Sequence, residues 1–289
     1  MTPSGSPRLA FVQLDLPGRL GPDDGRYLLR DEASEAQTVV VVQTVGATAS
    51  RRRGRRRPRR ADSANPATEV PLTRLTVIAP ERSERQSLEA ELERLRRDAD
   101  AAEERIVAAF AAANQLLRAH RIATQDPYGH EIGRRAPLVA RTGFGTGDGL
   151  ADGRWEEAIE VPPPIRRERR AQALRPQERL AAVLTGREPI DVCEPLLLRA
   201  RADLDQARPR EAALQLRVGL EALLAELPGR AGPDQEADLA ALGDRRGATR
   251  SAAEAALRGD LAPDQAVELT ETLRICERVL RRRQALRPD

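Results

Sequence analysis

Residues 161–165 read VPPPI, and this short stretch divides the chain into two parts of different character. Consecutive prolines remove backbone donors and hold the backbone extended, so neither a helix nor a strand is expected to cross them. A chain of 289 residues is long enough for two domains of ordinary size. The sequence therefore predicts an α+β domain over 1–161 and an all-α helical bundle over 162–289.

Four stretches before the prolines have the patterns of β-strands. Val12, Leu14 and Leu16 alternate with polar residues, which is typical of a half-buried strand. LPGRLGPDDGRYLLR (16–30) is expected to form a turn followed by a strand, and two further strands are expected in the β-branched TVVVVQTV (38–45) and in LTRLTVI (72–78). These stretches predict a small N-terminal sheet.

The glycine-rich stretch TGFGTGDG (142–149) lacks the pattern of a nucleotide-binding loop. Its glycines alternate, whereas the dinucleotide fingerprint needs Gly-x-Gly-x-x-Gly at the start of a helix. Alternate glycines leave one face of an extended strand bare, so another backbone or a side chain such as Trp155 is expected to lie close against it. The stretch predicts a structural hairpin, and a binding loop is the alternative.

Beyond the prolines, apolar residues recur at helical spacing, and Gly and Pro separate the segments. Cys193 and Cys276 fall at apolar positions of two such segments, which predicts small buried side chains and not a redox or metal site. The five expected helices of the bundle lie near 166–185, 190–207, 210–227, 235–257 and 264–286.

The longest pattern runs from Ser83 to Arg121 and predicts one helix with a coiled-coil seam. Such a helix would be about 57 Å long, which exceeds the length of the strands beside it. We therefore expect its first half to project and to mediate self-association through Leu88, Leu92 and Leu95; packing against the chain's own bundle is the alternative. The seam positions, separated alternately by four and three residues, are Leu88, Leu92, Leu95, Ala99, Ala102, Ile106, Ala109, Ala113, Leu116 and His120.

The charged residues exclude several kinds of chemistry. All 48 basic residues are arginine, so a lysine-dependent phosphate loop or Schiff base cannot form. The net charge is +3, and without the eight arginines of residues 51–60 it is +3 − 8 = −5, so the basic character is local.

The N-terminus lacks a signal-peptide pattern and no apolar stretch is long enough to span a membrane, which predicts a cytoplasmic protein without a membrane partner.

The run RRRGRRRPRR (51–60) lies between two predicted strands. The segment around it, 46–71, has no apolar periodicity, so we expect a disordered loop. Guanidinium groups can bind phosphates, but the loop has no aromatic side chain to stack on bases, which predicts non-specific binding of nucleic acid. A purely solvated loop is the alternative. The candidate phosphate-binding residues are Arg51, Arg52, Arg53, Arg55, Arg56, Arg57, Arg59 and Arg60.

Both histidines of the chain fall in one stretch, HRIATQDPYGHE (120–131). Imidazole and carboxylate groups can hold zinc or iron, but this spacing matches no known metal motif. A histidine near a helix C-terminus is also favoured by the helix dipole, so we expect a structural role and no cofactor. The candidate ligands in the alternative interpretation are His120, Asp126, His130 and Glu131.

These features predict a non-catalytic cytosolic interaction or assembly protein that self-associates through the long helix, with a protein partner that the sequence does not identify. Non-specific nucleic-acid binding through residues 51–60 is the first alternative. A metal-dependent enzyme centred on His120 and His130 is the second.

Overall fold

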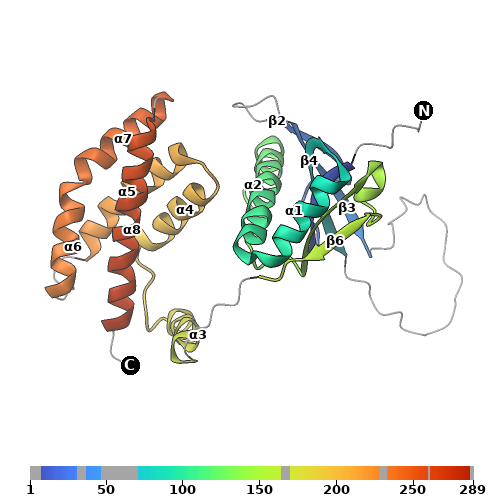
Figure 1. The fold of residues 1–289 in the computed structure, drawn as a ribbon. Helices are drawn as coiled ribbons and strands as arrows, with labels where there is room; N and C mark the ends of the chain where they lie inside the picture. The colour runs from blue at the N-terminus through green and yellow to red at the C-terminus, as the bar shows by residue number, and fades with distance from the viewer. Residues whose placement is uncertain are drawn as a thin grey trace, which may run out of the picture. The chain divides into compact units, whose positions relative to one another are not determined.

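A computed structural model describes residues 8–30, 37–46, 71–163, 170–227, 233–259 and 261–286. The chain forms two compact units, Met1–Arg166 and Arg167–Asp289. The first contains a six-stranded antiparallel sheet with two α-helices, and the second contains helices and no strand among its described residues (Figure 1). The predicted order, an α+β region followed by a helical region, is confirmed.

The sheet contains all the strands that the alternating and β-branched patterns predict. Its order is β2-β3-β4-β1-β5-β6, and all neighbours are antiparallel. The side chains of β1 are buried along the strand because both faces are covered there: Val12 and Leu14 lie in the main core, and Phe11 stacks on Trp155. The strands are β1 (Arg8–Pro17), β2 (Gly25–Arg30), β3 (Gln37–Val45), β4 (Leu72–Ser83), β5 (Val139–Thr146) and β6 (Glu157–Glu160).

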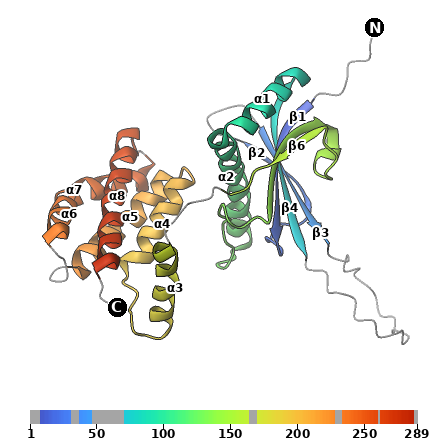
Figure 2. The same ribbon diagram turned by 60° about the horizontal axis from the view of Figure 1, so that its bottom comes forward.

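Two helices, α1 (Arg85–Arg97) and α2 (Ala99–Thr124), cover one face of the sheet (Figure 2). On β1, Val12 and Leu14 point towards this face and are buried there. Ile106 on α2 packs in the same cluster and is fully buried. The alternating pattern of β1 therefore meets the apolar stripe of α2, as expected for a helix packed on a sheet.

The predicted single helix over 83–121 is wrong, because the chain bends at Asp98. Its backbone is extended there, with φ −116° and ψ 99°. The Asp98 carboxylate accepts hydrogen bonds from the amides of Asp100 and Ala101, at 3.1 and 3.0 Å. Asp98 is thus the N-cap of α2, and it satisfies amides that would otherwise lack partners at the start of that helix.

The expected projection of the first half of this helix is also wrong. Because of the bend, α1 has 13 residues and is only about 20 Å long, so it can lie along the sheet. Leu88 and Leu92 are buried against Ala10 and Phe144, and Leu95 joins the main core beneath α2. Leu88, Leu92 and Leu95 therefore pack within the chain's own N-terminal unit, against the sheet and α2.

The second unit has six described helices where five are predicted. The expected helix over 235–257 is divided at Arg245, whose backbone has φ −84° and ψ −6°. Its amide bonds to the carbonyl of Leu242, three residues back, which tightens and ends the first helix. The helices are α3 (Arg170–Leu184), α4 (Cys193–Asp205), α5 (Pro209–Glu226), α6 (Pro233–Asp244), α7 (Arg246–Arg258) and α8 (Pro263–Leu286).

Leucines of α5 form the centre of the core of the helical unit. Leu216, Leu220 and Leu223 are buried together with residues of α4, α7 and α8. Cys193 and Cys276 are free and buried in the same core, which confirms their prediction as small buried side chains. Burial raises the pKa of the Cys276 thiol to about 12.

None of the described helices combines the length and the apolar content that crossing a membrane requires.

Candidate functional site

The face of the sheet opposite the helices is partly covered by the connection between β5 and β6. This connection includes the 3₁₀ helix η1 (Gly147–Leu150), and its Trp155 ring stacks on Phe11 with the ring centroids 5.4 Å apart. A Cβ atom on Gly143 would lie 2.2 Å from the carbonyl oxygen of Glu157. The glycines of this stretch therefore allow a close backbone approach, as the structural-hairpin interpretation predicts.

A buried amide fastens this connection to the sheet. Gln13 on β1 is fully buried, and its Nε2 donates to Thr76 Oγ1 at 3.0 Å and to the carbonyl of Ala151 at 3.3 Å. Among the described residues its Oε1 has no hydrogen-bond partner. Buried polar groups with specific partners of this kind fix one arrangement of a loop on a sheet.

A cluster of charges lies beside Gln13 on the same face. Arg74 Nε and Arg141 NH1 donate to the Asp15 carboxylate at 2.7 and 2.8 Å. Burial alone would raise the pKa of Asp15, but the hydrogen bonds and charges of the two arginines outweigh burial and hold that pKa below its usual value. A carboxylate held ionised by two arginines is a poor proton acceptor, which argues against a role in proton transfer. The cluster instead links the neighbouring strands β4, β1 and β5.

The four candidate metal ligands are not brought together. His120 lies near the end of α2, and its ring packs against the turn between β1 and β2. A Cβ atom added to Gly21 in this turn would lie 3.1 Å from the ring. His130 is exposed in the segment that follows α2. Among the residues that the structure describes, no three His, Cys, Asp or Glu side chains are grouped as metal ligands, so His120, Asp126, His130 and Glu131 form no such set.

Of the other two predicted sites, the structure describes only the leucines of the long helix. Leu88, Leu92 and Leu95 are buried beneath α1 and are not exposed to a partner. The eight arginines of 51–60 lie outside the described residues. The flanking strands β3 and β4 are hydrogen-bonded neighbours, and Val45 pairs with Leu72, so the prediction that this segment joins neighbouring strands is confirmed.

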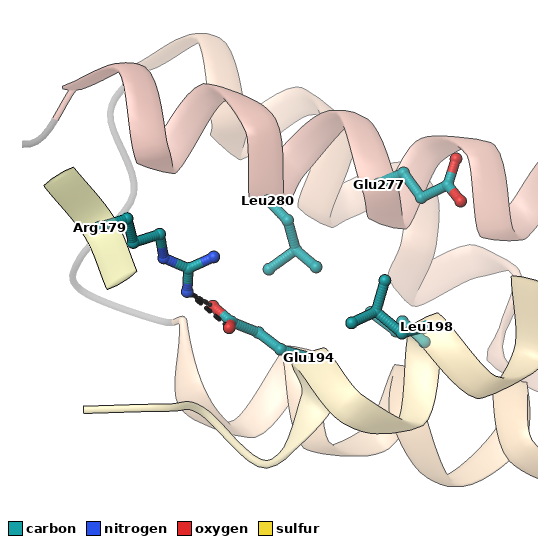
Figure 3. A pocket seen from close by; sticks show the side chains of 6 residues that line it. Arg179, Glu194, Leu198, Glu277 and Leu280 are labelled. Atoms are coloured by element: carbon teal, nitrogen blue, oxygen red, sulfur yellow. Dashed lines mark hydrogen bonds and ion pairs between the residues drawn. The ribbon is translucent and has the colours of Figure 1, made fainter. Parts of the chain in front are cut away.

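A hollow of about 110 Å³ opens on the helical unit between α3, α4 and α8 (Figure 3). Binding sites for ligands and cofactors usually have volumes of about 300–1,000 Å³, so this hollow is smaller than such sites. Three leucines form its wall, and charged residues lie at its ends. The lining residues are Arg179, Glu194, Leu197, Leu198, Glu277 and Leu280.

Both ends of the hollow are closed by ion pairs. Arg179 donates from Nε to Glu188 at 3.0 Å and from NH2 to Glu194 at 2.6 Å. At the other end, Arg201 makes two hydrogen bonds to the Glu277 carboxylate, at 2.7 and 3.0 Å. The charged groups thus satisfy one another, and the open part of the hollow is apolar.

Five large apolar side chains are exposed on α3, on α4 and in the segment that joins them, and one of them, Leu198, lines the hollow. We call these five the α3–α4 surface: Leu180, Leu184, Ile190, Val192 and Leu198. Thirteen large hydrophobic residues are exposed in the described part of the chain, and these five fall within 19 consecutive residues. Contiguous exposed apolar surface is typical of interaction sites, whereas single exposed hydrophobic residues are ordinary.

Sequence reasoning did not identify the α3–α4 surface, although one signal was present. Leu196, Leu197 and Leu198 are consecutive, and successive residues of a helix point about 100° apart. Three leucines therefore span too wide an arc to face one core. The structure buries Leu197 and leaves Leu198 exposed.

Comparisons with known proteins give no independent indication of function. No family model matches the sequence, and neither curated proteins nor solved structures give a match. The function must therefore be inferred from the residues and their arrangement.

Proposed function

We propose that this chain is a non-catalytic cytosolic interaction or assembly protein, and that its contact surface is the α3–α4 surface of the helical unit. The observation that carries the proposal is the exposure of five large apolar side chains within 19 consecutive residues, one of which, Leu198, lines an apolar hollow. Water-exposed apolar area is costly, and its burial against a partner contributes about 25 cal/mol per Å². The proposed contact surface is therefore the α3–α4 surface and not the seam of the predicted long helix.

The arrangement of α3 supports the proposal. Leu180 and Leu184 are separated by one helical turn, so they lie on the same side of α3, and both are exposed. Arg179, next to Leu180, is paired with Glu194 on α4, which places α3 beside the start of α4. The apolar side chains of α3 and the exposed Leu198 of α4 can therefore contribute to one interface.

The proposal predicts that glutamate at Leu180 and Leu184 removes a protein partner. Both side chains are exposed, so the substitutions should leave the fold intact while placing charges in the interface. We expect recovery of a specific partner from extracts of the native cells to fall at least about tenfold, which corresponds to ~1.4 kcal/mol. The measurement is quantitative mass spectrometry of proteins retained by the tagged full chain.

The matched control carries glutamate at Val218 and Leu257, which are exposed on α5 and α7 of the same unit. The control should retain every partner of the unaltered chain. Equal recovery of all partners by the Leu180/Leu184 variant and by the control would refute the proposed surface.

The second candidate function is non-specific binding of nucleic acid through the arginines of 51–60, supported by eight guanidinium groups within ten residues. We expect deletion of Ser50–Arg60 to abolish binding to duplex DNA without lowering the melting temperature, since β3 and β4 pair from Val45↔Leu72 onward without it. If about six arginines neutralise phosphates, log K should fall with log salt at a slope near −5. Binding that survives the deletion would remove this candidate.

A further inference from the structure

We infer that α3 is a hinged arm of the helical unit and that Arg179 is the latch that holds this arm against α4. While the latch is closed, Leu180 and Leu184 of α3 belong to the α3–α4 surface. When it opens, α3 moves away from α4 and the surface comes apart. This inference rests on the proposed function and concerns how its contact surface is regulated.

The apolar core of the unit does not hold α3 in place. Of the nine side chains at 176–184, six are exposed, three are partly exposed, and none is buried or belongs to the core. By contrast, α5 of the same unit has six buried residues. Burial of apolar surface supplies most of the free energy that docks a helix in a protein. The described part of α3 therefore lacks the contribution that fixes α5.

One side chain of α3 links this helix to the start of α4. The Nε of Arg179 donates to Glu188 at 3.0 Å, and its NH2 donates to the two carboxylate oxygens of Glu194 at 2.7 and 2.6 Å (Figure 3). Among the side chains at 176–184, Arg179 alone forms an ion pair with another part of the unit. An ion pair that keeps contact with solvent changes an equilibrium by up to about fivefold. Docking of α3 is therefore reversible.

The segment that joins α3 to α4 has the form of a hinge. Gly186, two residues beyond the end of α3, has a φ of +73°, a conformation that favours glycine and commonly ends helices. At the other end of the segment, Asp191 is fixed by its ion pair with Arg283 of α8. None of the side chains at 187–190 is buried. Rotation within this short segment can therefore move α3 and leave the core undisturbed.

Docking of α3 sets the affinity for a partner. A partner that contacts α3 and α4 together binds only the docked arm, so its apparent affinity falls with the docked fraction. α3 has 15 residues, and isolated helices of about this length are only marginally stable in water. A detached α3 therefore also loses the helical spacing that places Leu180 and Leu184 side by side.

Hydrogen–deuterium exchange of the purified full chain, followed by mass spectrometry, tests the latch without a partner. Arg179→Ala should speed exchange of the α3 amides about two- to fivefold, the range that such an ion pair contributes to an equilibrium. Alanine is the best helix former, so faster exchange cannot come from a lower helix propensity. The melting temperature should not change, because Arg179 lies outside the core.

The matched control is Arg201→Ala. Arg201 pairs with Glu277 at the other end of the hollow and joins α4 to α8, which the core also holds together. This control should leave exchange of α3 unchanged. The conservative variant Arg179→Lys keeps the charge but loses the planar fork that reaches two glutamates. Its exchange should lie between that of Arg179→Ala and that of the unaltered chain.

Salt provides a second measurement, to which a purely packing role of Arg179 would not respond. Raising NaCl from about 0.05 M to about 1 M shortens the screening length to about 3 Å. Exchange of α3 in the unaltered chain should then speed up towards the rate in Arg179→Ala. Exchange in Arg179→Ala itself should change little, because that variant has no latch to screen.

Partner capture connects the latch to the surface. Recovery of the partner by Arg179→Ala should fall about two- to fivefold, as the docked fraction falls. This loss is smaller than the loss of at least about tenfold that is expected for Leu180→Glu/Leu184→Glu. Arg201→Ala should retain the partner.

The outcomes separate the latch from the proposed function. Equal exchange of α3 in Arg179→Ala and in the unaltered chain would overturn the inference, and the proposed function would stand if Leu180→Glu/Leu184→Glu still removed the partner. Faster exchange together with full recovery of the partner by Arg179→Ala would also overturn the inference, because the latch would not control the surface. Faster exchange with no partner lost by Leu180→Glu/Leu184→Glu would confirm the latch and refute the proposed function.

Discussion

Replacing Leu92 and Leu95 with glutamate should unfold the N-terminal unit rather than separate two copies of the chain. Both leucines are buried, Leu92 against Phe144 and Leu95 in the main core. Truncating one buried leucine to alanine costs about 2–5 kcal/mol, and an unpaired carboxylate in the same place costs more. Domains are usually stable by about 5–15 kcal/mol, so the double substitution is expected to exceed that margin.

The single tryptophan of the chain reports on this unit alone. Trp155 is stacked on Phe11, so loss of the sheet should shift its fluorescence, whereas the far-ultraviolet circular dichroism of the helical unit should persist. The control variant carries glutamate at Gln86 and Ala90, which are exposed on the same helix. Its urea midpoint should change little, since exposed substitutions usually alter stability by less than about 0.5 kcal/mol.

A folded Leu92→Glu/Leu95→Glu variant with reduced mass would contradict this expectation. It would show that α1 leaves the sheet and packs against another copy. The same two substitutions therefore distinguish packing of the seam within the N-terminal unit from the self-association that the heptad spacing predicts.

The strands could be predicted because the pattern that identifies each one lies within a few consecutive residues. On β1 the apolar residues Val12 and Leu14 face the helices, while Gln13 faces the other side of the sheet. Alternation of this kind depends only on the extended geometry of a strand. The glycines at 143 and 145 likewise indicated a close backbone approach before any tertiary contact was known.

The bend at Asp98 was not predictable from the apolar spacing alone. Residue 98 lies between seam positions Leu95 and Ala99, so the heptad register appears continuous across it. In the structure Ala99 is exposed and Ala101 is buried, because the extended residue rotates the second helix relative to the first. Asp98 followed by ADAAEE (99–104) also suits a helix N-terminus, and this capping signal outweighed the continuous apolar spacing.

The α3–α4 surface depends on tertiary packing, which sequence patterns describe only in part. Periodicity shows that Leu180 and Leu184 share one side of a helix, but not whether another element covers that side. Ile190 and Val192 precede α4, where apolar residues are often buried by neighbouring helices, yet both are exposed. Whether an apolar residue is exposed depends on whether another element covers it, and this is determined by the tertiary fold.

Replacing Arg283 with alanine should cost the helical unit about 3–5 kcal/mol, because it removes one partner of a buried ion pair. Arg283 on α8 donates to Asp191, which lies just before α4, and both side chains are 9% exposed. The positive charge also acts on Glu226, whose carboxylate accepts hydrogen bonds from the amides of Val192 and Cys193 at 2.9 and 3.2 Å. One arginine thus compensates two carboxylates where α4, α5 and α8 meet.

Urea unfolding followed by circular dichroism at 222 nm measures the loss, since most of the helical signal belongs to this unit. Arg281→Ala is the matched control: it lies on the same helix, is largely exposed, and should cost less than about 0.5 kcal/mol. The double variant Asp191→Asn/Arg283→Ala should recover part of the loss, because it removes one of the uncompensated charges. Equal losses from Arg281→Ala and Arg283→Ala would show that this ion pair is not a buried support.

The same arginine should affect how the unit responds to acid. Burial raises the pKa of Glu226, but the hydrogen bonds from Cys193 and Val192 and the charge of Arg283 outweigh it, so the folded-state pKa lies below the usual glutamate value. Stability from Glu226 is therefore fully present above the ordinary carboxyl pKa, and it is lost as the pH falls through the lowered value. Without Arg283 the folded-state pKa of Glu226 should rise only in part towards the unfolded one, because the hydrogen bonds from Cys193 and Val192 lower it more than the charge does. Stability measured between about pH 3 and 6 should then fall less steeply with acid in Arg283→Ala than in the unaltered chain.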